Sequence, residues 1–301
     1  MVNKTKKIVF ARVNRRRPSQ DTIAMRPFSV DMSELAESRL TTFHEKAKSQ
    51  RTGRTWFAAD MTLDASGDFL TATLGFSVRE ERRTFDEDAW SWIKGETQLS
   101  DTGSEATVVP FAVDLRESQR WVAFATSARI QPSTFCVGLE KVLNQAVVDA
   151  GMVPTEWEVD LVVARARVDQ WLTENPFVHL IRRTIKFSNP GRDIDNDRRE
   201  MRALGAKRKT EEFKAPYNGT LRTDSEEFSK KLDGTETGDL ELYMEARGNR
   251  GVTNSKFNSK KSADEMFVDD FGRDLMAGME LALAALREYI ATKALGERAQ
   301  E

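Results

Sequence analysis

The amino-acid sequence predicts an α+β protein with mostly antiparallel sheets backed by helices, arranged as two intimately packed halves. Up to residue 151, alternating apolar segments flank the turn sequences DASGD (64–68) and RESQ (116–119), a pattern typical of β-hairpins. From residue 152 onward, short strand-like and helix-like segments alternate. Hairpins followed by such alternation indicate the α+β class. We therefore expect an N-terminal α+β half, 1–151, with two β-hairpins, and a C-terminal α/β half, 152–301, ending in a long helix.

The first half is expected to hold an initial strand, the two hairpins and two helices. The spacing of apolar residues predicts strands over 7–13, 55–63, 69–83, 106–115 and 120–130. An amphipathic helix is expected over 32–48, and Ser133 is the expected N-cap of a second helix that ends at Gly151. The acidic segment 85–96 is expected to be a loop or a short helix. Its Trp90 and Trp92 are suited to stacking on bases, to anchoring a partner or to core packing.

The second half is expected to alternate regularly between strands and helices. The same spacing predicts strands over 156–164, 179–187, 209–215 and 239–247, and helices over 168–175, 197–206 and 225–234. Ser262 and Glu265 form a capping-box pattern. We therefore expect the final helix to follow Ser262 directly, with Phe267 and Phe271 on its apolar face.

The composition excludes several classes of protein. With 39% hydrophobic residues, the 301-residue chain can bury a substantial core, and no segment reaches the ~18 apolar residues of a membrane span. The apolar run near the N-terminus is too short for a signal peptide, so we expect a cytoplasmic protein with no membrane partner. The single cysteine, Cys136, excludes an internal disulfide and a zinc site built from several cysteines.

Charge is nearly balanced overall but clustered locally. The 46 basic and 48 acidic residues leave a net charge of -2, so any electrostatic binding site must be a local one. Short basic runs are candidates for contacting a nucleic-acid backbone, and the alternative is that they are solvated faces. The candidate nucleic-acid-binding residues are Arg15, Arg16, Arg17, Arg182, Lys186, Lys207, Arg208, Lys209 and Arg250.

The segment SNPGRDIDNDRRE (188–200) places aspartates at three alternate positions before a basic run. An EF-hand loop would need a glycine and a closing glutamate where Arg198 and Leu204 stand, so a calcium site of that kind is not expected. Carboxylates in the first turn of a helix are stabilised by its dipole and would repel a phosphate. We interpret the segment as a helix start.

A metal-dependent nuclease is the catalytic alternative. Asp239, Glu241 and Glu245 share one face of the predicted strand 239–247, where they could hold a Mg²⁺ ion that activates water. The competing interpretation is cross-strand ion pairing, in which Arg182 and Lys186 neutralise Glu241 and Glu245. No phosphate-binding loop or nucleophile elbow is present, and the two histidines lie in positions typical of structural residues. These observations favour a protein without catalytic activity over the nuclease and leave both open. We expect no resident metal or cofactor, except Mg²⁺ in the case of the nuclease.

The order of elements over about residues 180–290 resembles a group of uncharacterised prokaryotic proteins associated with phage defence and mobile elements. The matching order is a strand, FSNPG, a polar helix, a strand, a helix, a strand, EARGNRG and a final long helix. The resemblance implies a role in antiviral defence. Together with the basic runs, it predicts a nucleic-acid-binding or assembly subunit that contacts DNA, RNA or a partner protein. A purely structural subunit, docked through its tail helix, is the remaining alternative.

Overall fold

The protein is an α+β protein whose sheets are antiparallel. The computed structural model describes residues 4–16, 47–48, 54–78, 83–86, 91–94, 107–116, 119–149, 156–186, 197, 200–201, 203–248 and 254–298. Every strand pairing within these ranges is antiparallel. The predicted fold class is confirmed.

The larger sheet has eight strands in the order β14-β1-β8-β7-β4-β3-β2, with β9 also paired to β1. Its strands are β1 (Thr5–Arg16), β2 (Ala47–Lys48), β3 (Arg54–Leu63), β4 (Phe69–Val78), β7 (Thr107–Asp114), β8 (Trp121–Ala125), β9 (Glu156–Leu161) and β14 (Glu265–Asp269). The predicted hairpins are present as β3–β4 and β7–β8. In the first of them, the Asp64 carboxylate accepts hydrogen bonds from the Ser66 hydroxyl and the Phe69 amide, which closes the predicted turn.

Strand β1 joins segments that are far apart in the sequence. One edge of β1 pairs with β8. The other edge is shared, because β14 pairs with Thr5–Val9 and β9 pairs with Ala11–Arg16. Residues 152–301 therefore contribute two strands to the first sheet, and the expected division near residue 151 is not the division between the sheets.

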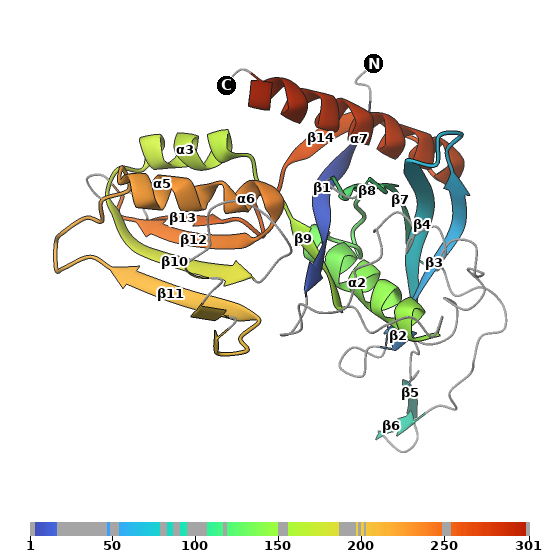
Figure 1. Ribbon diagram of the computed structural model, residues 1–301. Coiled ribbons are helices and arrows are strands. Elements are labelled where there is room, and N and C mark those ends of the chain that lie inside the picture. Colours follow the sequence, from blue (N-terminus) through green and yellow to red (C-terminus); the bar gives the residue numbers. More distant parts are fainter. Residues whose placement is uncertain are drawn as a thin grey trace.

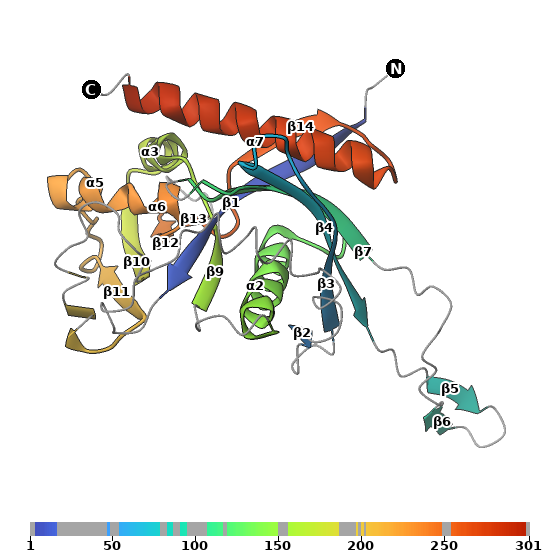
Figure 2. The ribbon, with the colours of Figure 1, turned by 45° about the vertical axis from the view of Figure 1, so that its right-hand side comes forward.

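Two helices cover opposite faces of the larger sheet (Figure 2). Helix α2 (Pro132–Asp149) stacks its Phe135 ring on Phe124 of β8, with ring centroids 3.8 Å apart. Helix α7 (Leu275–Arg298) stacks Tyr289 on Phe10 of β1, at 4.0 Å. The apolar face of the tail helix is therefore buried against its own sheet. None of the described helices is long and apolar enough to cross a membrane.

The smaller sheet lies beside the larger one and is covered on one face by short helices (Figure 1). Its order is β11-β10-β12-β13, with β10 (Val178–Lys186), β11 (Arg208–Lys214), β12 (Leu240–Ala246) and β13 (Ser255–Asn258). The covering helices are α3 (Arg165–Glu174), α5 (Glu226–Leu232) and α6 (Gly234–Thr237). A core that includes Val168, Phe228 and Met244 joins the two layers.

The tail helix begins later than the sequence predicts. Residues 265–269 form β14 and pair with β1, because their side chains alternate between exposed and half-buried positions as a strand requires. The helix begins at Leu275, where the Asp274 carboxylate accepts a hydrogen bond from the Ala277 amide at 3.0 Å. The Ser262–Glu265 pattern is therefore not a helix cap, and Phe267 lies on a strand.

Segment 85–96 also differs from the expectation of a loop or short helix. β5 (Arg83–Asp86) and β6 (Ser91–Lys94) pair as a separate two-stranded sheet, and Trp92 lies in β6. Trp90 lies outside the described residues, as does the predicted helix 32–48 except for 47–48 in β2. Asp193 and Asp195 are likewise outside. Asp197 is helical and buried, and it pairs with Lys209 and Lys231 at 2.8 Å each.

Candidate functional site

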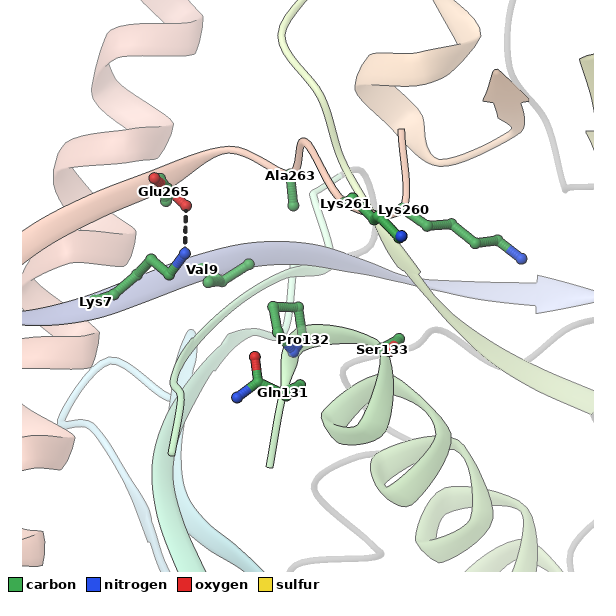
Figure 3. A pocket seen from close by; sticks show the side chains of 9 residues that line it. All are labelled: Lys7, Val9, Gln131, Pro132, Ser133, Lys260, Lys261, Ala263 and Glu265. Atoms are coloured by element: carbon green, nitrogen blue, oxygen red, sulfur yellow. Dashed lines mark hydrogen bonds and ion pairs between the residues drawn. The ribbon is translucent and has the colours of Figure 1, made fainter. Parts of the chain in front are cut away.

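A cavity of about 300 Å³ lies where the start of α2 meets β1, β14 and the turn between β13 and β14. Three of its nine lining residues are lysines, Lys7 from β1 and Lys260 and Lys261 from the turn. Glu265 of β14 is the only acidic residue among the nine. Figure 3 shows the Lys7 and Glu265 side chains on neighbouring strands, directed toward each other, and the Lys260 side chain directed away from them. We call this cavity the lysine pocket.

The turn that carries two of these lysines is held in place by hydrogen bonds. The Asn258 side chain accepts from the Lys260 amide at 3.0 Å, and the Asn258 carbonyl accepts from the Lys261 amide at 2.8 Å. Buried Ser259 exchanges hydrogen bonds with Leu242 of β12, one through its amide and one through its hydroxyl oxygen. The turn is therefore fixed to the smaller sheet, and its lysines project from a rigid backbone.

Buried Asp264 fixes the other end of the same segment. Its carboxylate accepts hydrogen bonds from the Ala164 amide at 2.8 Å and from the Tyr289 hydroxyl at 2.9 Å. Its backbone bonds to Phe10 and Val162, where β14 and β9 meet on β1. Burial, and then the Asp264 carboxylate, raise the pKa of the Tyr289 hydroxyl, which therefore stays protonated and donates.

The lysine pocket carries an excess of positive charge. The Lys7 ammonium lies 2.8 Å from the Glu265 carboxylate, and the Lys260 ammonium lies 2.9 Å from Glu241 of β12. Lys261 is exposed and forms no ion pair with any residue that the structure describes. Three lysines and one glutamate therefore line the pocket, and among the described residues only the Lys261 ammonium is not held by a neighbouring acid.

The start of α2 adds to the lysine pocket the partial positive charge of its helix dipole, which is smaller than the charge of a lysine. The first helical hydrogen bond runs from the Phe135 amide to the Gln131 carbonyl, so Gln131 precedes the helix and Pro132 is its first residue. Ser133 therefore lies inside the helix and is not the predicted N-cap. No acidic residue stands in the first turn to offset the positive end of the helix dipole.

A second group of charged side chains lies behind the lysine pocket, at the junction of the two sheets. This charge cluster consists of Glu140 of α2, Glu158 and Asp160 of β9, Lys186 of β10, Arg208 of β11 and Glu241 of β12. The buried Lys186 ammonium bonds to Asp160 and lies 2.5 Å from Glu241 and 3.8 Å from Glu158. Lys260 connects the two sites, because it lines the pocket and pairs with Glu241.

Ion pairing outweighs burial at the centre of the charge cluster. Burial disfavours the Lys186 ammonium, but Asp160 and Glu241 more than compensate and raise the pKa of Lys186. Burial likewise opposes ionisation of Glu241, yet Lys186 and then Lys260 lower the pKa of Glu241. Both groups are therefore charged at neutral pH, and the cluster joins the two sheets electrostatically.

Glu140 behaves differently from the other carboxyl groups of the charge cluster. It is half-buried on α2. Burial, and then the charges of Glu158 and Asp160, raise the pKa of Glu140 to about 7. The positive charges of Lys186 and Arg208 oppose this increase. Four carboxylates (Glu140, Glu158, Asp160 and Glu241) face three cations (Lys186, Arg208 and Lys260). A proton on Glu140 balances these charges.

The candidate metal ligands on 239–245 have separate partners. Asp239 is buried and accepts a hydrogen bond from the Thr237 hydroxyl, whereas Glu241 belongs to the charge cluster. Glu245 accepts from the Tyr243 hydroxyl and pairs with Lys256 at 3.1 Å. Among the described residues, no group of three or more His, Cys, Asp or Glu side chains is placed to hold a metal ion. The predicted cross-strand pairing is present between Lys186 and Glu241, while Glu245 pairs with Lys256 instead.

Most of the candidate nucleic-acid-binding residues that the structure describes have acidic partners. Lys186 is buried in the charge cluster, and Arg208 lies 3.0 Å from Glu158. Arg182 pairs with Glu212, Lys207 pairs with Glu156, and Lys209 contacts Asp197, Glu200 and Glu211. Arg15 and Arg16 lie at the end of β1, and Arg17 and Arg250 lie outside the described residues.

Cys136 lies on α2 next to the charge cluster and is expected to be unreactive in the native protein. Its side chain is buried; burial, and then the charge of Asp160, raise the pKa of the thiol. We expect alkylation by iodoacetamide at about pH 8 to be at least about tenfold slower in the folded protein than in urea. Mass spectrometry of timed samples measures this, and equal rates in both conditions would show that the thiol is accessible.

The sequence contains the Lys260–Lys261 run, but basic runs alone do not reveal the lysine pocket. Lys7 is more than 250 residues away in the chain, and only the pairing of β1 with β14 brings it beside the turn. An available signal was the Asn258–Ser262 segment, because Asn and Ser next to paired lysines are typical of a tight turn that exposes them.

No protein-family model matches the chain, and no curated protein matches it significantly. The resemblance of residues 180–290 to phage-defence proteins stays a prediction. The chemistry of the lysine pocket and of the charge cluster is therefore the basis for a function.

Proposed function

We propose that the chain is a non-catalytic nucleic-acid-binding subunit that holds a backbone phosphate of its ligand in the lysine pocket. The observation that carries the proposal is a preformed cavity of about 300 Å³ lined by three lysines and one glutamate, in which Lys261 has no acidic partner among the described residues. Lysine ammonium groups bind phosphate as point charges, and the positive end of the α2 dipole adds to their attraction.

The distribution of charge favours this pocket over the predicted basic runs. Lys186 and Lys209 already contact carboxylates inside the protein, as Lys7 and Lys260 do at the pocket, so at any of these four residues a phosphate would have to displace a partner. Lys261 has no such partner among the described residues and is exposed to solvent. Since the net charge is only -2, attraction for a polyanion depends on local sites of this kind.

The two alternative functions have less support. For the nuclease, the Lys186 ammonium pairs with both Asp160 and Glu241, where a metal ion would need their carboxylates. For the purely structural subunit, the apolar face of the tail helix is used against the larger sheet. A partner protein and a role in antiviral defence remain predictions from the sequence.

Replacing Lys261 tests the proposal. We expect Lys261→Gln to weaken binding of a fluorescent oligonucleotide of about 20 nucleotides by roughly threefold to tenfold, and to reduce the slope of log affinity against log salt by about one. Fluorescence anisotropy at about 50 to 200 mM salt measures both quantities.

The matched control for this experiment is Lys214→Gln. Lys214 is 69% exposed on β11, in the other sheet, and should have no effect on binding. Wild-type protein that shows no salt-dependent binding, or a Lys261→Gln variant that binds as tightly as the wild type, would refute a phosphate site in the lysine pocket.

A further inference from the structure

Phe267 is an aromatic side chain on the surface at the centre of β14. It is 63% exposed, whereas its neighbours Met266 and Val268 point to the other face of the strand and pack against the core under α7. Strand alternation therefore presents Phe267 to solvent on the face that α7 does not cover. A large exposed aromatic ring is a suitable anchor for a binding partner.

The position of Phe267 places it beside the lysine pocket. Phe267 is directly opposite Lys7 in the β1–β14 pairing, and Val9 is opposite Glu265. Lys7, Val9 and Glu265 all line the pocket, so Phe267 shares their face of the sheet. It stands two residues along β14 from Glu265, a step of about 7 Å. One nucleotide spans a comparable distance between its phosphate and its base.

We propose that the ligand is a single-stranded nucleic acid, with one base stacked on Phe267 while an adjacent phosphate occupies the lysine pocket. This inference rests on the proposed phosphate site and adds the conformation of the ligand. A base inside a duplex has both faces covered by its neighbours, whereas an unpaired base offers one face to an aromatic ring. A basic pocket next to an exposed ring is the combination by which proteins bind single strands without reading their sequence.

The test compares Phe267→Ala with wild type on three ligands of equal length. They are a single-stranded oligonucleotide, the duplex of the same sequence, and an abasic strand that keeps the phosphates and lacks the bases. We expect wild type to prefer the single strand to the duplex. Phe267→Ala should weaken single-strand binding by about fivefold to thirtyfold and leave binding of the abasic strand unchanged. DNA and RNA strands are tested in parallel, and this pattern with either supports the inference.

Two further variants separate stacking from folding. Tyr217→Ala removes a ring that is 95% exposed near the smaller sheet, and we expect it to bind like the wild type. Phe267→Trp keeps an aromatic face and should retain single-strand binding. Because the Phe267 side chain is exposed, Phe267→Ala should unfold at the wild-type temperature, as monitored by circular dichroism.

The outcomes distinguish failure of this inference from failure of the proposed function. If Lys261→Gln weakens binding but Phe267→Ala does not, the phosphate site stands and stacking on Phe267 is refuted. If Phe267→Ala weakens the abasic strand as much as the normal strand, the ring does not act by stacking and the inference fails. If neither variant changes binding, both proposals fail.

Discussion

Lys186→Ala is expected to lower the free energy of unfolding by about 3 to 5 kcal/mol at neutral pH, measured by urea denaturation. Lys186 is buried where β9 of the larger sheet meets β10 and β12 of the smaller sheet. Removing its ammonium leaves Asp160 and Glu241 in a low-dielectric site without the cation that they share. The loss should shrink below about pH 4, because protonated carboxyl groups no longer require that cation.

Two further variants test whether the loss of stability in Lys186→Ala comes from the unpaired carboxylates. Lys214→Ala removes a lysine that is 69% exposed and pairs with Glu212, and it should change stability by less than about 0.5 kcal/mol. Adding Glu241→Gln to Lys186→Ala should recover part of the lost stability, because one buried negative charge is removed as well. A Lys186→Ala variant as stable as the Lys214→Ala variant would contradict the assigned role of the charge cluster.

Glu140→Gln is expected to stabilise the protein by about 1 to 2 kcal/mol at about pH 8 and to have little effect at about pH 4. Each pKa unit corresponds to about 1.4 kcal/mol, and partial exposure of the side chain reduces the effect through solvent screening. The amide has the shape of the carboxylic acid without its ionisation, so the negative charge beside Glu158 and Asp160 is avoided.

The direction of this pH dependence follows from the raised pKa of Glu140. The unfolded chain loses the Glu140 proton near pH 4.5, and the folded protein loses it near pH 7. Between these values the folded state binds more protons than the unfolded state, so this group makes stability fall as pH rises. Above about pH 7, Glu140 is ionised in both the folded and the unfolded protein. Its effect on the free energy of unfolding therefore no longer changes with pH.

Urea unfolding at a series of pH values measures the effect in wild type and in Glu140→Gln. The difference between the two curves should grow between about pH 4.5 and pH 7 and then level off. Glu280→Gln, on an exposed position of α7, serves as the matched control and should follow the wild type at every pH. Parallel curves for wild type and Glu140→Gln would show that Glu140 does not titrate in this range.

Local patterns in the sequence were sufficient to locate most strands and helices. The turn at 64–68 is encoded by Asp64, Ser66 and Gly67, because the hydrogen bonds that close it and its left-handed residue Gly67 lie within residues 64–69. Helix α2 can be predicted in the same way, because its apolar residues recur at helical spacing. Four of them, Phe135, Leu139, Val142 and Ala146, are all buried. Both features can therefore be predicted from short segments of the sequence.

The errors fall where pairing with a distant strand decides the structure. Residues 262–275 carry a capping-box pattern and apolar residues at helical spacing, but β1 offers a free edge, and Glu265–Asp269 pair with it as β14. Segment 83–94 forms a hairpin through pairing of β5 with β6, although its composition resembles a loop. Backbone hydrogen bonds to a partner strand therefore override local propensity at both places.

The sequence by itself determined the α+β class, the two hairpins and the alternation of strands and helices in residues 156–247, because these depend on periodicity and turn chemistry within short segments. Only the tertiary structure decided which charges meet. It buried Lys186 among carboxylates from two sheets, and it brought Lys7 beside Lys260 and Lys261 across the pairing of β1 with β14. The physical reason is that charge pairing and cavity formation act through space, and the sequence records neither the order of the strands nor the distance between their side chains.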